Sequence, residues 1–287
     1  MNLKRLTLTV ALASLPSLSF ATQVLTALPV THSLASALLD GTTVELKRAA
    51  PANLPASRQP SYFSGRGGAS LQKAAQQADA VIGLRSLWRD DPLYPVARRS
   101  NIRIVEIDAA RPVDGALPGI AVSGDDAHAA YPWLNPTNLG RMADVMANDL
   151  ERLSPQDKTR IQSNLAGLKR QLLELAASSQ TRLAKVDNLT VVSLSERLSY
   201  LASGLNLDVV EQPLPNDWDT AALEALGANL KAQDVALVLD HRQPEAAVAE
   251  VIRASGAKLV VVESDPEDAL GGLKASVDQV IKALVDS

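Results

Sequence analysis

Residues 154–184, "SPQDKTRIQSNLAGLKRQLLELAASSQTRLA", carry the pattern of one long helix. Ser154, Pro155 and Asp157 supply an N-cap hydroxyl, a first-turn proline and an acid three residues after the cap, a combination typical of a helix start. Apolar side chains then recur on one face (Ile161, Leu165, Leu168, Leu172 and Leu175), and neither glycine nor proline follows Gly167. At about 1.5 Å per residue, roughly 30 residues predict a rod of about 45 Å, long enough to run along two lobes. The alternative is two ordinary helices that break at Gly167.

On both sides of this helix, short apolar runs alternate with amphipathic segments, a pattern that indicates parallel sheets with crossover helices. The first half predicts strands at 23–30, 79–84 and 101–107, and another strand just before the irregular loop 48–68. A further short strand, "GIAVS", is possible at 119–123. Helices are predicted at 32–41, 69–77 and 135–153. The second half predicts strands at 188–194, 207–210, 234–240 and 258–264, each followed by a helical segment, the last of which runs from 266 to about 283. The predicted fold class is therefore α/β, with two parallel-sheet lobes (22–136 and 187–287) bridged by linking helices (137–186) that include the long one.

The first 21 residues have the features of a cleaved signal peptide. Lys4 and Arg5 precede an apolar run, and Ser19-Phe20-Ala21 places small residues where a signal peptidase requires them, so we expect cleavage after Ala21. The alternative is an N-terminal membrane anchor, for which the apolar run is short. The chain has no cysteine, which excludes a thiolate nucleophile, a zinc-thiolate site and a lipid-anchoring cysteine. The net charge of -4 argues against a nucleic-acid partner, which would need a basic face.

Three segments, taken in order, resemble one known family. They are "YPWLNP" (131–136), "TVVSLSERLSYLASGLNLDVV" (190–210) and "KLVVVESDP" (258–266). With two α/β lobes and one long helix, they resemble the substrate-binding proteins of bacterial ABC importers for zinc, manganese and iron. The resemblance implies a ligand held between the lobes at the carboxyl ends of the strands, a place in the periplasm of a Gram-negative cell, and an ABC permease and its ATPase as partners.

The resemblance also implies four metal-binding positions, usually three histidines and one carboxylate. Here they fall on Phe63, Tyr131, Ser195 and Asp265, so that the carboxylate alone is kept. Zinc and manganese need several imidazole or anionic donors around them. The inherited site is therefore not expected to hold a bare cation.

The three histidines of the chain offer an alternative metal site. His32, His128 and His241 each follow an apolar run that predicts a strand, so all three could approach the cleft together with Asp240 or Asp265. Such a set could hold iron, zinc or manganese as a free ion. The competing hypothesis is that these are unconnected surface or capping histidines.

Aromatic and arginine side chains suggest an organic ligand. Aromatic residues make up only 3% of the chain, yet Tyr62, Phe63, Trp88, Tyr131 and Trp133 cluster in the loops of the first lobe, where Arg66, Arg85 and Arg89 also occur. Aromatic faces with guanidinium groups suit a planar, partly anionic molecule, and a metal chelate such as an iron–siderophore complex is one such ligand. The predicted ligand-binding residues are Tyr62, Phe63, Arg66, Arg85, Trp88, Tyr131, Ser195 and Asp265. Alternatively, the aromatic residues fill the space of the lost metal site and the protein binds no small ligand.

Three hypotheses of function follow. The first is a binding protein for a metal chelate, the second is a binding protein for a free metal ion, and the third is a non-transporting interaction protein that assists a second periplasmic binding protein. No nucleophile elbow and no ordered Ser, His and acid set is found, so an enzyme is not expected. We expect a monomer.

Overall fold

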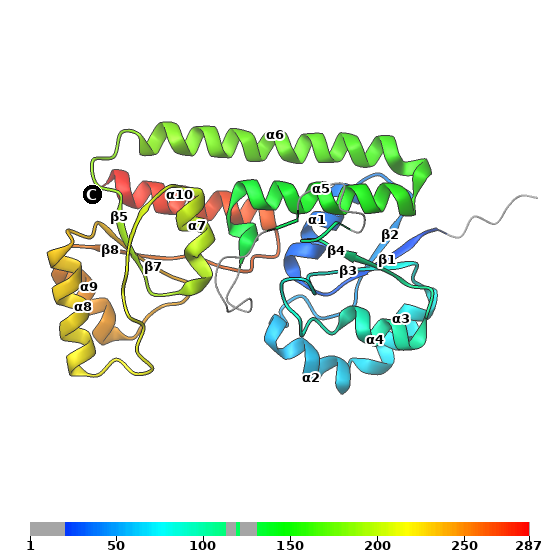
Figure 1. The fold of residues 1–287 in the computed structure, drawn as a ribbon, viewed down its shortest axis with the longest axis horizontal. Helices are drawn as coiled ribbons and strands as arrows, with labels where there is room; N and C mark the ends of the chain where they lie inside the picture. The colour runs from blue at the N-terminus through cyan, green and yellow to red at the C-terminus, as the bar shows by residue number, and fades with distance from the viewer. Residues whose placement is uncertain (1–20, 113–118, 121–130, 287) are drawn as a thin grey trace, which may run out of the picture.

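The computed structural model describes residues 21–112, 119–120 and 131–286. It has two separate parallel sheets, one at each end of an elongated molecule (Figure 1). No helix in the described part is long and apolar enough to cross a membrane. The predicted signal peptide lies outside the described residues apart from Ala21.

The first lobe is a four-stranded sheet in the order β2-β1-β3-β4. Its strands are β1 (Gln23–Thr26), β2 (Glu45–Arg48), β3 (Ala80–Gly83) and β4 (Val105–Asp108), and the helices around them are α1 (Pro29–Leu39), α2 (Gln59–Ser64), α3 (Gly68–Gln77) and α4 (Leu93–Ser100). Val24 is in register with Leu46 on one side and Ala80 on the other. The central strands β1 and β3 are buried on both faces, as expected of a parallel sheet covered by helices.

The second lobe repeats the same strand order, β6-β5-β7-β8. Its strands are β5 (Thr190–Ser193), β6 (Asp208–Val210), β7 (Leu237–Asp240) and β8 (Lys258–Val261), and its helices are α7 (Ser199–Gly204), α8 (Thr220–Ala232), α9 (Ala246–Ser255) and α10 (Ala269–Val285). In each sheet the order of connection reverses between the two central strands, and ligands of such sheets bind beyond the carboxyl ends of the strands at this point. The predicted α/β class with two parallel-sheet lobes is confirmed.

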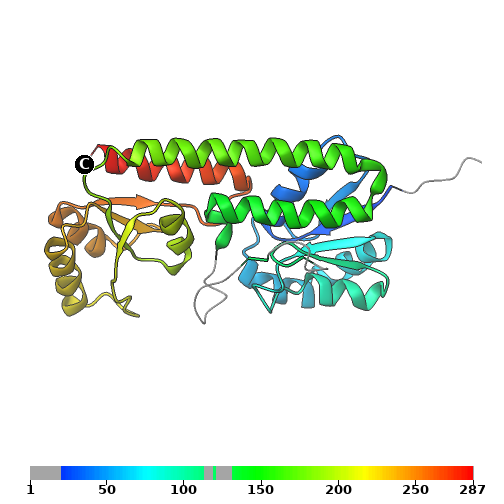
Figure 2. The same cartoon turned by 45° about the horizontal axis from the view of Figure 1, so that its top comes forward.

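Helices α5 (Pro136–Leu153) and α6 (Lys158–Leu183) join the lobes. Helix α6 spans the back of both lobes, while α5 lies over the first lobe and α10 over the second (Figures 1 and 2). The 26 residues of α6 form one uninterrupted helix through Gly167, about 39 Å long. The alternative of two helices that break at Gly167 is therefore excluded. A short 3-10 turn, Pro155–Asp157, separates it from α5.

The start of α6 differs from the predicted capping pattern. Ser154 does not cap the helix, because its hydroxyl donates to the Asp157 carboxylate at 2.8 Å. The same carboxylate accepts the backbone N–H (3.1 Å) and the hydroxyl (2.7 Å) of Thr43 in the first lobe. Asp157 therefore fixes the α5–α6 corner onto the first lobe.

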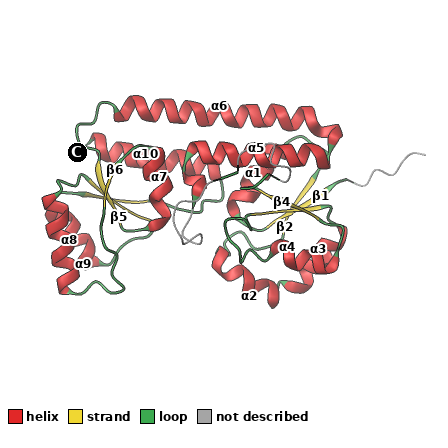
Figure 3. Ribbon diagram, in the orientation of Figure 1, coloured by secondary structure: helices red, strands yellow, loops and turns green. Residues whose placement is uncertain are grey.

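One hydrophobic core runs through both lobes and the linking helices. It contains Leu34 of α1, Met142 of α5, Leu168 of α6, Leu201 of α7 and Leu273 of α10, all of them buried. The two lobes are therefore parts of one packed body, whose secondary structure is summarised in Figure 3.

Three local expectations need correction or cannot be compared. The loop 48–68 is not fully irregular, because it contains a 3-10 turn, Ala56–Arg58, and α2. Helix α4 was not predicted, and the predicted strand at 23–30 ends at Thr26 because Pro29 begins α1, where its fixed φ is favourable. Most of the possible strand at 119–123 falls outside the described residues.

Candidate ligand-binding cleft

A cleft of about 860 Å³ opens between the lobes at the carboxyl ends of the strands. The first lobe contributes the loops after β1 (Leu28 and Pro29), after β2 (residues 52–57, 59 and 60) and after β3 (residues 88 and 90–92). The second lobe contributes Arg197 after β5 and three acids after β8, namely Glu263, Asp265 and Glu267. Tyr131, at the entrance to α5, completes the lining.

The two walls of the cleft differ in chemistry. The first-lobe wall presents apolar and conformationally restricted residues, including Trp88 and the prolines at 29, 55, 60 and 92. Its buried acid, Asp91, is occupied by structural bonds, because its carboxylate accepts the backbone N–H groups of Leu84 (2.9 Å) and Leu93 (3.1 Å). Burial raises the pKa of Asp91, and these two bonds act against that rise. The second-lobe wall is mainly charged, so a ligand would meet an apolar surface on one side and ionic groups on the other.

Three aromatic rings form a cluster at the base of the cleft. Tyr131 lies 5.7 Å from Trp88 and 4.8 Å from Trp133 between ring centroids, and the two tryptophans are 5.4 Å apart. Trp133 is buried, and its Nε1–H donates to the backbone carbonyl of Ser264 at 3.0 Å, which ties the cluster to the second lobe. Trp88 Nε1 is buried without a hydrogen-bond partner among the described residues.

Arg197 is held over the aromatic cluster by the turn that follows β5. Ser195 begins this 3-10 turn, Glu196–Leu198, and its backbone carbonyl accepts the Ser193 hydroxyl at 2.7 Å. Leu198 is fully buried and anchors the turn, while the Arg197 guanidinium carbon lies 5.0 Å from the centroid of the Tyr131 ring. A guanidinium group at this distance from a ring face makes a favourable cation–π contact.

The Asp265 carboxyl has an unusual protonation equilibrium. Burial raises the pKa of Asp265 to about 7, and repulsion from Glu267 adds to the rise, while Arg197 and Arg48 act against it. Glu267 itself forms an ion pair with Arg48, which connects the end of β2 in the first lobe to the loop before α10 in the second. The Asp265 carboxyl makes no hydrogen bond or ion pair with the residues that the structure describes.

The residues at the four expected metal positions do not form a metal site. Tyr131 and Asp265 line the cleft, but Phe63 is 3% exposed within the second core cluster of the first lobe, and Ser195 is buried in its turn. Across residues 21–112, 119–120 and 131–286, no three His, Cys, Asp or Glu side chains are grouped so that they could hold a metal ion. One carboxylate and one phenol supply too few donors for zinc or manganese.

The histidines do not provide a replacement within the described residues. His32 belongs to α1, where its Nδ1 lies 2.9 Å from the Thr26 hydroxyl, and it borders a separate hollow of about 530 Å³ behind the cleft. His241 follows β7, and its Nδ1 lies 3.2 Å from Asp240, an ion-pair distance without hydrogen-bond alignment. Burial lowers the pKa of both imidazoles, so they are mainly neutral at pH 7. His128 lies outside the described residues.

Three other predicted ligand residues have structural partners away from the cleft. Tyr62 packs edge-on against Phe63 at 5.2 Å, and Arg66 lies 5.5 Å from the Tyr62 ring, so these residues form their own surface cluster. Arg85 makes two hydrogen bonds of 2.7 Å to Glu106. None of them lines the cleft, although Arg85 belongs to the same loop as Trp88, which does.

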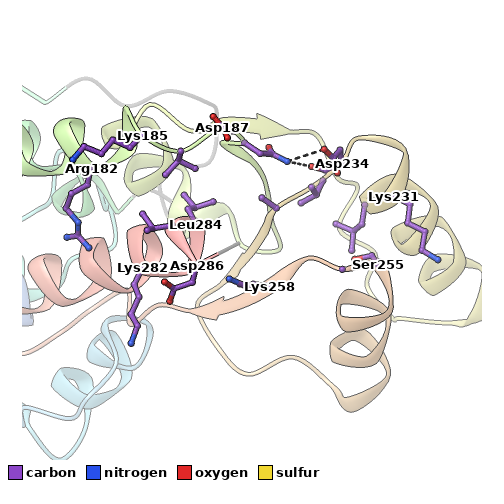
Figure 4. A pocket seen from close by; sticks show the side chains of 17 residues that line it. Arg182, Lys185, Asp187, Lys231, Asp234, Ser255, Lys258, Lys282, Leu284 and Asp286 are labelled. Atoms are coloured by element: carbon purple, nitrogen blue, oxygen red, sulfur yellow. Dashed lines mark hydrogen bonds between the residues drawn. The ribbon is translucent and has the colours of Figure 1, made fainter.

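A second large hollow, about 880 Å³, lies at the far end of the second lobe (Figure 4). Its cations come mainly from helix ends, since Arg182, Lys231 and Lys282 lie in the last turns of α6, α8 and α10. Lys258 donates to the carbonyl of Ala283 in α10 at 3.0 Å. Cations at helix carboxyl ends stabilise the helices themselves, which accounts for this cluster without a ligand.

Arg197 is the main site residue that sequence reasoning missed. It lies only two residues after Ser195, in the segment "SLSERLSYL" that follows a predicted strand. A charged residue in a loop at the carboxyl end of a parallel strand was an available signal, since such loops face the ligand site.

Comparison with known proteins identifies the family. The model of the family described as zinc-uptake complex component A, periplasmic (ZnuA), matches residues 68–286, which is more than half of the chain. A comparison with curated proteins gives no match. Among solved structures, that of ZnuA is 19% identical with a TM-score of 0.68, covering 92% of this chain and 100% of that one.

Two further structures are similar in fold. A mutant of FpvC from Pseudomonas aeruginosa is 21% identical with a TM-score of 0.72, covering 92% of this chain and 100% of that one. A manganese-bound mutant of a periplasmic metal-binding protein from Candidatus Liberibacter asiaticus is 16% identical with a TM-score of 0.69, covering 92% and 99%. Together with two parallel-sheet lobes, one long bridging helix and a cleft between them, the family match shows that the chain belongs to the ZnuA family of periplasmic metal-binding substrate-binding proteins.

Proposed function

We propose that this protein is the periplasmic binding component of an ABC importer for transition-metal uptake and that its cleft takes a metal chelate. The observation that carries the proposal is the combination of a cleft of about 860 Å³ with a lining that supplies too few donors for a bare cation. A volume of this size falls within the range of about 300–1,000 Å³ typical of sites for organic molecules. A chelate brings its metal already coordinated, so the protein needs only to recognise the organic shell.

The chemistry of the two walls supports such a ligand. Trp88 and Tyr131 line the cleft and offer aromatic surface to a planar chelator. On the opposite wall, Arg197 suits the oxygen atoms of a catecholate, hydroxamate or carboxylate, while Glu263 and Asp265 suit an amino group. A ligand with an apolar face and a mixed ionic edge would match both walls.

The setting of the proposal comes from the family. Members of this family work with an ABC permease and its ATPase, and one solved FpvC structure is of a complex with a Ni²⁺ ion. For this chain, export through the signal peptide 1–21 into the periplasm of a Gram-negative cell, action as a monomer, and cooperation with a second periplasmic binding protein are part of the proposal.

Tryptophan emission tests the proposal. The chain has three tryptophans, of which Trp88 lines the cleft, Trp133 packs beside it and Trp218 packs on the second lobe. Ferric complexes of catecholate, hydroxamate and citrate chelators are titrated into the wild-type protein, and at least one is expected to quench the emission in a saturable manner. Trp88→Phe should weaken or abolish this response, whereas Trp218→Phe should preserve its midpoint.

Equilibrium dialysis against zinc, manganese and ferric ions separates the alternatives. Tight binding of a bare ion would contradict the proposal and favour a metal site that includes His128. If neither chelates nor ions bind, the non-transporting interaction protein becomes the better hypothesis.

A further inference from the structure

We propose that Arg197 is a resident cation: its guanidinium group takes the electrostatic place of the metal ion and excludes free divalent cations from the cleft. This inference deepens the proposed function and rests on it, because it explains why a chain of this family would accept a chelate and refuse a bare ion. It concerns one side chain and can be tested without knowing the chelate.

The position of the guanidinium group is the first argument. Its carbon lies 5.0 Å from the centroid of the Tyr131 ring, and Tyr131 occupies one of the expected metal-ligand positions. Its Nη1 lies 3.5 Å from the hydroxyl of Ser264, the neighbour of Asp265 at a second such position. The residue itself follows Ser195, a third such position, by two places. Arg197 thus contacts Tyr131 and Ser264, and it lines the same cleft as Tyr131 and Asp265.

The influence of its charge is the second argument. Burial raises the pKa of Tyr131 and of Asp265, and Arg197 is the strongest influence acting against that rise at both groups. Burial lowers the pKa of His241, and Arg197 lowers it further. These directions agree with the position of the guanidinium group in the cleft, beside groups from three different loops.

The local structure shows why this charge is held in place. The turn Glu196–Leu198 is fixed by the buried Leu198 side chain and by the hydrogen bond that the Ser193 hydroxyl donates to the Ser195 carbonyl. The aliphatic part of Arg197 can cover apolar surface while its head is held by the Tyr131 ring and the Ser264 hydroxyl. A divalent cation that approached Asp265 would meet a fixed positive charge of the same sign, which raises the free energy of its binding.

Chemical rescue of Arg197→Ala tests the inference. Methylguanidinium chloride, at millimolar concentration, is titrated into the full-length mature protein, with sodium chloride at equal ionic strength as the reference. The variant is expected to bind methylguanidinium saturably, as a change in tryptophan emission and a rise in Tm, whereas the wild-type protein shows neither. Arg242→Ala is the matched control, because it removes the same charge from the exposed end of the next loop, after β7. The inference is overturned if methylguanidinium leaves Arg197→Ala unchanged or acts equally on Arg242→Ala.

A second pair of variants keeps the inference testable if the alanine variant folds poorly. Arg197→Gln keeps the approximate size and removes the charge, while Arg197→Lys keeps the charge. In equilibrium dialysis, Arg197→Gln is expected to bind Zn²⁺ at least about tenfold more tightly than the wild type, a difference of about 1.4 kcal/mol, and Arg197→Lys is expected to match the wild type. Equal Zn²⁺ affinity of the two variants overturns the inference. Because neither test uses a chelate, failure of the chelate titration and failure of this inference can be told apart.

Discussion

Asp265→Asn is expected to change how the stability of the protein depends on pH. The pKa of Asp265 is raised from 3.8 to about 7, chiefly by burial and then by repulsion from Glu267. A carboxyl whose pKa is higher in the folded than in the unfolded chain keeps its proton on folding. From about pH 4 to about pH 7 the folded protein then binds more protons than the unfolded chain, so the free energy of unfolding falls as the pH rises and levels off above about pH 7.

The size of the effect follows from the shift. About three pH units correspond to about 4 kcal/mol if the whole shift acts on stability. Because the Asp265 side chain is partly exposed, solvent screening reduces this to about 2 kcal/mol. Asparagine has nearly the same shape and cannot ionise, so the variant should match the wild type near pH 4 and exceed it by about 2 kcal/mol near pH 8.

Urea denaturation followed by tryptophan emission, repeated across this pH range, measures the difference. His32 and His241 have lowered pKa values, so their contribution to stability is lost as the pH falls below their ordinary value, but this loss occurs in both proteins and cancels in the difference. Asp208→Asn, on the exposed edge of β6, is the matched control for the loss of one carboxylate. If the wild-type and Asp265→Asn curves run parallel from pH 4 to pH 8, the reasoning about Asp265 is refuted.

Three further substitutions test the packing around the cleft and the long helix by urea denaturation. Gly167→Ala should stabilise the protein by about 0.5–1 kcal/mol, because a Cβ there meets no atom within 4 Å and alanine is the better helix former; a loss of stability would contradict this. Gly83→Ala should destabilise it by about 1–3 kcal/mol, since its Cβ would lie 2.6 Å from the Asp91 carboxylate; an unchanged stability would show that this acid can move. Trp133→Phe should cost about 1–3 kcal/mol by leaving the Ser264 carbonyl without its donor, and a neutral result would mean that water replaces the bond.

The fold was predictable because its signals are local and repeated. The strands β1, β3, β5 and β7 are short apolar runs, and α6 has a sustained apolar stripe on one face. These strands and this helix can therefore be predicted without knowing which distant residues they contact. The segment 56–64 was predicted less well because its helical turns depend on distant residues. The Gln59 side chain donates to the carbonyl of Ala27 at 3.2 Å, and Phe63 packs into the first-lobe core.

The site was predicted only in part, for a similar reason. Trp88, Tyr131 and Asp265, which were predicted to bind a ligand, line the cleft; Trp88 and Asp265 follow predicted strands, and Tyr131 precedes a predicted helix. Phe63 was expected to face a ligand, but only the three-dimensional packing shows that its side chain turns into the core. Arg197 was missed because a single charged residue in a loop has no sequence pattern that separates a site residue from a solvated one.

The bracing of the lobes limits how this protein can signal a bound ligand. Helix α6 packs on α1 of the first lobe and on α10 of the second, and α1 and α10 also contact each other. The Ser33 hydroxyl accepts the backbone N–H of Ala269 at 2.9 Å across the same junction. A wide hinge opening would separate these surfaces and expose residues such as Leu34 and Leu273, at about 1.5–3 kcal/mol for each side chain. Among the residues that line the cleft, Trp88 belongs to this same core and Ala56 packs against it, whereas residues 52, 53, 55 and 57 are exposed, so a ligand can reorder the 52–57 loop at much lower cost. Under the proposed function, a permease would therefore distinguish the loaded from the empty protein by the shape of the 52–57 loop rather than by the angle between the lobes.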